Sequence, residues 1–110
     1  MSNLLHQRCT AIVGGTPMGD AAVRDHLAQV SGWHFNSGAI EKTYSFKNYH
    51  ETIAFVNALA WICHTEDHHP DLAVSYSRCV VRFNTHSVGG ISINDFICAA
   101  KADALISFIA

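Results

Sequence analysis

Three histidines carry the strongest chemical signal in this sequence. His68 and His69 are adjacent and directly precede Pro70, and His86 follows later in the chain. An imidazole has an unperturbed pKa of about 6.5, so it can take up or release a proton near neutral pH. Proline pushes the residue before it towards extended backbone, which would stiffen the turn that carries the pair. These residue types therefore indicate either proton transfer or metal binding.

A metal site is the first interpretation. His64 and His68 are one helical turn apart, a spacing at which helical zinc sites place two ligands. The His-Glu-x-x-His motif of metalloproteases is absent, because Thr65 stands where that motif has glutamate. His68 also falls near the expected end of its helix, where this geometry is lost. We therefore expect no metal at this site and no bound cofactor.

Acid–base catalysis is the second interpretation. Side chains of adjacent residues in extended backbone point to opposite sides, so only one of His68 and His69 can be central to a reaction unless the turn redirects the other. The helix end, together with Asp67 and Asp71, favours a protonated imidazole. His86 joins the pair if the intervening strands form a hairpin. The plain alternative is that His-His-Pro ends a helix and His86 is a surface residue.

The pattern of apolar residues predicts the elements that would position these histidines. A helical period, with the spacing of capping residues at Asn48/Glu51 and Ser92/Asp95, predicts helices over about 20–31, 49–67 and 92–108. Alternating apolar residues predict strands over about 33–35, 40–46, 72–76 and 79–83, with tight turns at Asn36-Ser37-Gly38 and Ser77-Arg78.

The order of these elements, α-ββ-α-ββ-α, predicts the fold class. Two hairpins imply antiparallel pairing, and helices on one face of the sheet give the simplest buried core. We therefore expect an α+β two-layer sandwich, in which three helices cover one face of a four-stranded antiparallel sheet. The 110 residues suffice for one domain, 18–110, preceded by a flexible N-terminal leader, 1–17.

Composition limits the partners and the compartment. The net charge is −2, with 7 Lys and Arg residues, which argues against direct nucleic-acid binding. No apolar run approaches the roughly 20 residues that span a bilayer, and the first residues do not resemble a signal peptide. The four cysteines form no Cys-x-x-Cys pair, so we expect reduced thiols in a cytoplasmic protein.

The motifs around the histidines match a known family. They are Glu41-Lys42-x-Tyr44-x-Phe46, Asp67-His68-His69-Pro70-Asp71, Cys79-x-Val81-x-Phe83-x-Thr85-His86, and Ser92 with Asp95. Over roughly residues 20–108 the sequence resembles the pterin-4a-carbinolamine dehydratases. The resemblance implies dehydration of 4a-hydroxytetrahydropterin to quinonoid dihydropterin and water, a step of tetrahydrobiopterin recycling.

The same resemblance implies roles for individual residues. His68 and His86 match the acid–base pair of the family, and His69 matches its substrate-positioning and stabilising histidine. The residues that match contacts to the pterin are His68, His69, Pro70, Thr85, His86, Ser87 and Val88. Three further residues are supporting candidates: Asp95 as an orienter of a histidine, Asp67 beside the pair, and Trp33 as either a pocket wall or a core residue.

The sequence departs from the family pattern at one place, and the family also implies which partners to expect. The family commonly has Ala-Glu where this chain has Cys63-His64, a change that bears on turnover rate or pH optimum; Glu66 is a nearby carboxylate. Family members form homodimers that pair into homotetramers. Some relatives also act as transcriptional coactivators, so the alternative function is a non-catalytic dimerisation cofactor with a protein partner, which would extend the location to the nucleus.

Overall fold

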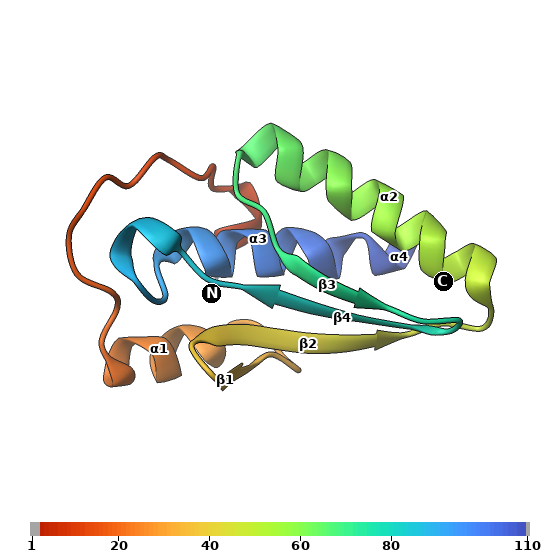
Figure 1. Ribbon diagram of the computed structural model, residues 1–110, viewed down its shortest axis with the longest axis horizontal. Coiled ribbons are helices and arrows are strands. Elements are labelled where there is room, and N and C mark those ends of the chain that lie inside the picture. Colours follow the sequence, from red (N-terminus) through yellow and green to blue (C-terminus); the bar gives the residue numbers. More distant parts are fainter. Residues whose placement is uncertain (1–2, 110) are drawn as a thin grey trace.

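Four antiparallel strands form one layer of the computed structural model, which describes residues 3–109 (Figure 1). The strands are β1 (His34–Asn36), β2 (Ala39–Ser45), β3 (Asp71–Val74) and β4 (Arg78–Phe83), in the spatial order β1-β2-β4-β3. The helices are α1 (Asp20–Leu27), α2 (Tyr49–Glu66), α3 (Ile93–Ala104) and the short α4 (Ile106–Ile109), with 3-10 helices η1 (Leu4–His6) and η2 (His86–Val88). The expected α+β two-layer fold is confirmed.

The two hairpins follow local turn chemistry to different extents. Ser37 and Gly38, with φ values of 50° and 82°, both adopt positive φ, as a two-residue turn matched to the twist of β1 and β2 requires. The β3–β4 turn is shifted from its expected place: Arg78 begins β4, and Tyr76 lies in the turn. Contacts with the start of α2 explain the shift, because Tyr76 stacks on Tyr49.

Two helices end earlier than the apolar pattern predicts. Helix α1 ends at Leu27, and tight turns lead to Gly32, whose φ of 86° favours glycine. Helix α3 ends at Ala104, and α4 follows as a separate turn. At that junction Leu105 N–H bonds to the oxygen of Ala102, three residues back, which tightens the last turn.

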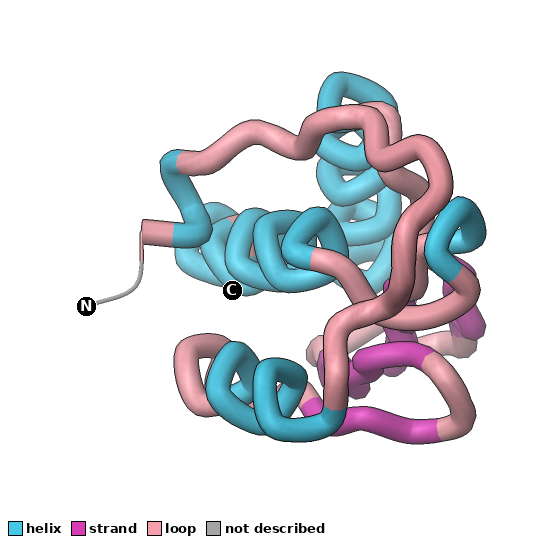
Figure 2. Tube along the Cα trace, turned by 90° about the vertical axis from the view of Figure 1, so that its left-hand side faces the viewer, coloured by secondary structure: helices cyan, strands magenta, loops and turns pink. Residues whose placement is uncertain are grey.

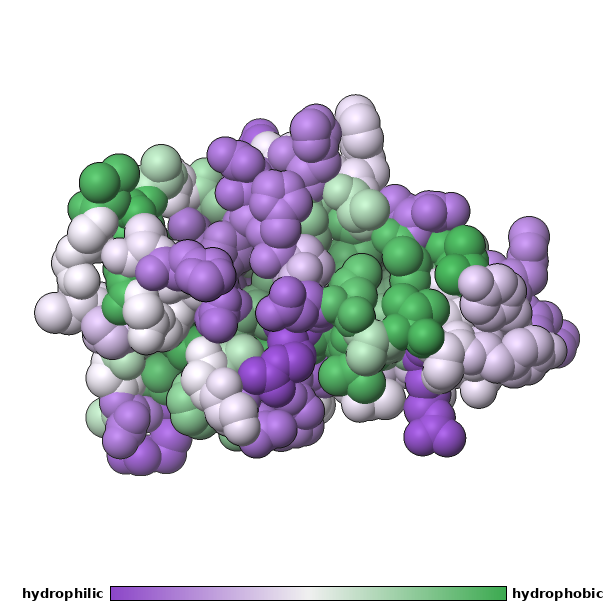
Figure 3. Space-filling view, viewed as in Figure 1, coloured by the Kyte–Doolittle hydropathy of each residue, from purple (hydrophilic) through white to green (hydrophobic). Residues whose placement is uncertain are grey.

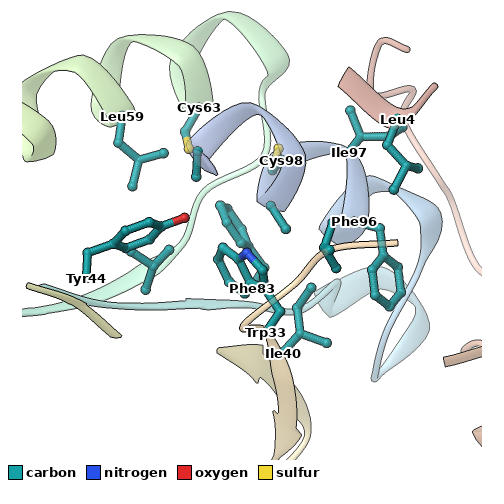
Figure 4. Close-up of a cluster of buried hydrophobic side chains, with 14 of the residues drawn as sticks. Leu4, Trp33, Ile40, Tyr44, Leu59, Cys63, Phe83, Phe96, Ile97 and Cys98 are labelled. Atoms are coloured by element: carbon teal, nitrogen blue, oxygen red, sulfur yellow. The ribbon is translucent and has the colours of Figure 1, made fainter. Parts of the chain in front are cut away.

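The core lies between the sheet and helices α2 and α3 (Figures 1 and 4). Phe55 and Leu59 of α2, Phe83 of β4 and Phe96 of α3 are completely buried. Burial of each such side chain contributes roughly 1.5–3 kcal/mol. Helices α2 and α3 are therefore packed together with β4 around one core. Among residues 3–109 no helix is both long and apolar enough to cross a bilayer.

The N-terminal segment packs against the rest of the domain. Leu4 of η1 is 2% exposed and belongs to the core cluster, and η1 lies against α3. The segment then crosses the end of the molecule that holds η2 before it enters α1 (Figure 2). The flexibility of a leader 1–17 stays a prediction, and residues 1 and 2 lie outside the described part of the chain.

Candidate active site

A pocket of about 560 Å³ lies where the end of α2, the segment after β4 and the N-terminal segment meet. The three histidines all line it, and so do three more of the predicted site residues, Asp67, Thr85 and Ser87. Figure 3 shows a hydrophilic surface over the end of α2 and the start of β3. The hairpin β3–β4 thus brings His86 to the histidine pair, as its predicted register requires.

The end of α2 aims the two adjacent histidines differently. Asp67 has left-handed backbone, φ 53° and ψ 43°, and His68 N–H donates to the oxygen of Cys63 at 3.1 Å, which closes the helix. After this turn the side chain of His68 is directed inwards and is 11% exposed. His69 stays exposed at the rim of the pocket.

His68 is held by a buried carboxylate. Its Nε2 lies 2.5 Å from Oδ1 of Asp95, and the Asp95 side chain is 0% exposed. The ring also stacks on Phe83, with an interplanar angle of 14°. Because a carboxylate accepts, Nε2 carries the proton, which leaves Nδ1 of His68 as the nitrogen able to exchange a proton with a ligand.

The cap of α3 holds Asp95 in turn. Its Oδ2 accepts from the main-chain N–H of Ser92 at 2.9 Å, which completes the capping box predicted at this helix start. The same oxygen accepts from the Thr85 hydroxyl at 2.9 Å. Thr85 therefore lines the pocket with a hydroxyl that is already committed to Asp95 and to Ser92 Oγ, 2.6 Å away.

A closed loop presents His86. Thr85 N–H donates to the oxygen of Gly90 at 2.7 Å, and Gly90 N–H returns a bond to Thr85 at 3.3 Å. Gly89 has a φ of 68°, which lets the chain reverse after η2. His86 and Ser87 are exposed on this loop at the pocket.

Three predicted residues lie away from the pocket lining. Val88, the last residue of η2, is buried, and Pro70 is half-buried. Trp33 is 5% exposed in the core, where its Nε1–H donates to Asp103 at 3.1 Å. Of the two alternatives for Trp33, this position favours the core residue.

His64 and Glu66, the two residues near the end of α2 that were compared in the sequence, lie in different surroundings. His64 is exposed and its ring lies against Trp61, with centroids 5.9 Å apart, so it diverges from His68. Glu66 is 8% exposed, at the junction of α2 with the N-terminal segment. Within residues 3–109 no group of three or more histidine, cysteine or acidic side chains is arranged to hold a metal ion.

Electrostatics keep Glu66 ionised. Burial by itself would raise the pKa of this carboxyl, but the Cys9 N–H, Lys101 and Arg8 outweigh burial and hold the pKa below its usual value. Arg8 Nε lies 2.9 Å and Lys101 Nζ 3.7 Å from Oε2. Glu66 thus anchors the chain that passes over the pocket.

Sequence reasoning missed part of the lining. Residues 9–12 of the N-terminal segment form one wall, and Thr65, Asn84 and Asn94 contribute as well. The segment shows no periodic pattern, and its pairing partners are far away in the sequence. The one sequence signal for Asn94 is that it directly precedes Asp95.

Comparisons with known proteins agree with this geometry. The family model for pterin 4 alpha carbinolamine dehydratase matches residues 16–105. A Chromobacterium violaceum relative that carries the name pterin-4-alpha-carbinolamine dehydratase is 53% identical over 103 residues, covering 94% of this chain and 95% of its own. A Stenotrophomonas maltophilia relative of the same name is 56% identical over 105 residues, covering 93% and 90%.

A solved structure extends the likeness to three dimensions. It is a transcriptional coactivator/pterin dehydratase from Brucella melitensis, 26% identical in sequence, with a TM-score of 0.79 over 82% of this chain and 98% of that one. The three histidines, the buried carboxylate and these matches lead to one assignment: this chain belongs to the pterin-4a-carbinolamine dehydratase family.

Proposed function

We propose that this protein is a hydro-lyase that converts 4a-hydroxytetrahydropterin to quinonoid dihydropterin and water, in the recycling of tetrahydrobiopterin. The observation that carries the proposal is the pair formed by His68 and Asp95 in a pocket that His69 and His86 also line. At about 560 Å³ the pocket lies within the range of small-molecule sites.

The reaction requires two proton movements. The C4a–O bond breaks with its electrons on oxygen, so the hydroxyl must receive a proton to leave as water, and N5 must lose its proton as the new double bond forms. His68 suits the base, since Asp95 leaves Nδ1 free and stabilises the imidazolium that results. His86 is the acid, and His69 positions the substrate and stabilises developing charge. No external co-reactant is consumed.

The decisive experiment is a dehydratase assay on purified protein. We expect the wild type to accelerate loss of 4a-hydroxytetrahydropterin, and His68→Ala and His86→Ala each to lower kcat by about a hundredfold or more. His50→Ala is the matched control, because His50 is an exposed histidine of α2 outside the pocket lining. Wild-type protein that is no faster than buffer would refute the proposal.

We also propose that the chain forms homodimers or homotetramers in the cytoplasm. Strand β3 is an edge of the sheet, where Leu72 and Val74 are 37% and 41% exposed, and Tyr76 in the turn that follows is 65% exposed. Figure 3 shows hydrophobic side chains gathered over this strand. An exposed apolar edge is a surface that a second copy covers well. All four cysteines are free thiols, which supports a reducing compartment.

A coactivator-type binding module is the second candidate function. The name of the Brucella melitensis structure favours it, and the exposed β3 edge offers a surface for a protein partner. It predicts that partner binding survives in the His68→Ala variant. A His68→Ala variant that loses dehydration but still binds the partner would show that both functions coexist. A catalytically active protein that binds no partner would support the dehydratase function only.

A further inference from the structure

We propose that residues 8–12, here called the strap, form a substrate-binding wall of the active site, with Asn94 and Glu66 as the positioning residues that hold it. The inference rests on the proposed dehydratase function and adds to it an element before α1. Cys9, Thr10, Ala11 and Ile12 line the same pocket as the three histidines.

Asn94 holds the strap through main-chain atoms. Its side-chain Nδ2 donates to the oxygen of Thr10 at 2.8 Å, and Thr10 N–H donates to Asn94 Oδ1 at 3.3 Å. This amide therefore pairs with both backbone groups of one residue, much as a neighbouring strand would. Asn94 is 5% exposed and precedes Asp95 in the first turn of α3, so the strap is tied to the element that orients His68.

Glu66 holds the strap from the other side. Its Oε1 accepts from Cys9 N–H at 2.7 Å, and its Oε2 lies 2.9 Å from Arg8 Nε. Hydrogen bonds to a charged group are stronger than those between neutral groups. Because Glu66 is the last residue of α2, this anchor is two residues from His68.

Cysteine packing completes the attachment. Cys9 Sγ lies 3.6 Å from Cys98 Sγ and 3.6 Å from the main-chain oxygen of Asn94. Cys98 is completely buried in α3, whereas Cys9 is half-buried. The strap is thus fixed to α2 and α3, the two helices whose ends carry His68 and Asp95.

The chemistry of the strap predicts which kinetic constant it controls. Thr10, Ala11 and Ile12 have no group that titrates near neutral pH, so they offer the substrate contact area rather than protons. The half-buried Ile12 is the largest apolar side chain among them, and a flat bicyclic pterin gains affinity from apolar walls. Loosening the strap should therefore raise KM and leave kcat nearly unchanged.

The test compares full-length variants in the dehydratase assay. We expect Ile12→Ala and Asn94→Ala to raise KM about tenfold with kcat within about twofold of wild type. Ile12→Trp should block the pocket and weaken binding more strongly. Gln7→Ala is the matched control, because Gln7 lies in the same segment, bonds Asn3 and does not line the pocket; its KM should equal that of wild type.

A second measurement follows the strap itself. The rate at which 5,5′-dithiobis(2-nitrobenzoic acid) labels Cys9 should rise in Asn94→Ala, because a detached strap exposes that thiol; Cys9→Ser identifies the Cys9 phase. Faster labelling with unchanged KM in Asn94→Ala and in both Ile12 variants would overturn the proposal. If Asn94→Ala does not fold by circular dichroism, the Ile12 variants decide.

Failure of the proposed function gives a different result. An inactive wild type refutes the dehydratase, and the strap is then judged by fluorescence titration with 7,8-dihydrobiopterin. Weaker binding of this probe to Ile12→Ala than to wild type would support the wall, whereas equal binding, or none to either protein, would overturn it.

Discussion

Oδ1 of Asp95 lies 2.5 Å from Nε2 of His68, while Oδ2 of the same carboxylate accepts the Ser92 N–H that caps α3. One side chain therefore caps the start of a helix and orients a histidine. The position of the His68 ring depends on where α3 starts as well as on the turn that ends α2.

Replacement of Asp95 tests this shared role. Asp95→Asn keeps the size but turns an amide N–H towards either His68 or the donors Thr85 and Ser92. We expect kcat to fall about a hundredfold or more, because His68 loses its orienting acceptor, and unfolding free energy to fall by about 1–3 kcal/mol. Steady-state kinetics and urea unfolding measure the two effects.

Asp103→Asn is the matched control for that variant. Asp103 is a part-buried carboxylate that accepts from Trp33 and Lys42 and does not line the pocket. Its replacement should lower stability and leave kcat unchanged. Normal kcat in Asp95→Asn would contradict the orienting role of Asp95.

The histidine at position 64, where the family commonly has glutamate, should have little effect on catalysis. His64 is exposed against Trp61 and does not line the pocket, so His64→Glu should change kcat and KM by less than about twofold. The dehydratase assay across pH 6–9 checks this, with wild type measured in parallel. A clear gain in rate would show instead that a carboxylate at this position reaches the substrate.

Acid should weaken the fold through Glu66. Its folded-state pKa lies below its usual value, so the carboxylate contributes stability that is fully present above about pH 4.3 and is lost as pH falls through the folded-state pKa. Glu66→Gln should therefore lower stability at neutral pH and flatten its decline at acid pH. Urea unfolding as a function of pH measures both.

Part of the acid sensitivity should survive in that variant. Glu41 is a second carboxyl whose pKa lies below its usual value, and it is paired with Arg82 of β4 instead of with the strap. If the unfolding free energy of Glu66→Gln falls with decreasing pH as steeply as that of wild type, Glu66 does not contribute to the acid sensitivity.

The β3 edge should govern assembly. Val74→Lys places a charge on the edge strand, so we expect a shift towards monomers in analytical ultracentrifugation. Thr43→Lys is the control, because Thr43 is an exposed residue of β2, and β4 lies between β2 and the β3 edge. Oligomers of unchanged size in Val74→Lys would exclude this edge as the interface.

Local signals in the sequence predicted much of the site. The capping box at Ser92 and Asp95 and the hairpin between Pro70 and Thr85 are short-range patterns, and the hairpin predicted that His86 would lie near the histidine pair. The fold class follows from the same patterns. The role of Asp95 beside His68 came from the family resemblance. The turn at Tyr76 was missed because tertiary contacts, its stacking on Tyr49 among them, override the alternation.

The strap could not be predicted for a different reason. Its bonds join Cys9 to Glu66 and Thr10 to Asn94, groups separated by 57 and 84 residues. The periodicities used to recognise helices and strands describe neighbours in sequence and contain no information on such pairs. The residues that bind the strap can be identified only once the three-dimensional arrangement of the ends of α2 and α3 is known.

The double use of Asp95 also affects how the gene can change. A substitution there removes a helix cap as well as the partner of His68, so an impaired site would come with a less stable chain. Cells degrade destabilised proteins, and losses of about 1–2 kcal/mol alter abundance several-fold. Defective copies would therefore be depleted by proteolysis instead of accumulating as folded, inactive subunits that could enter mixed oligomers.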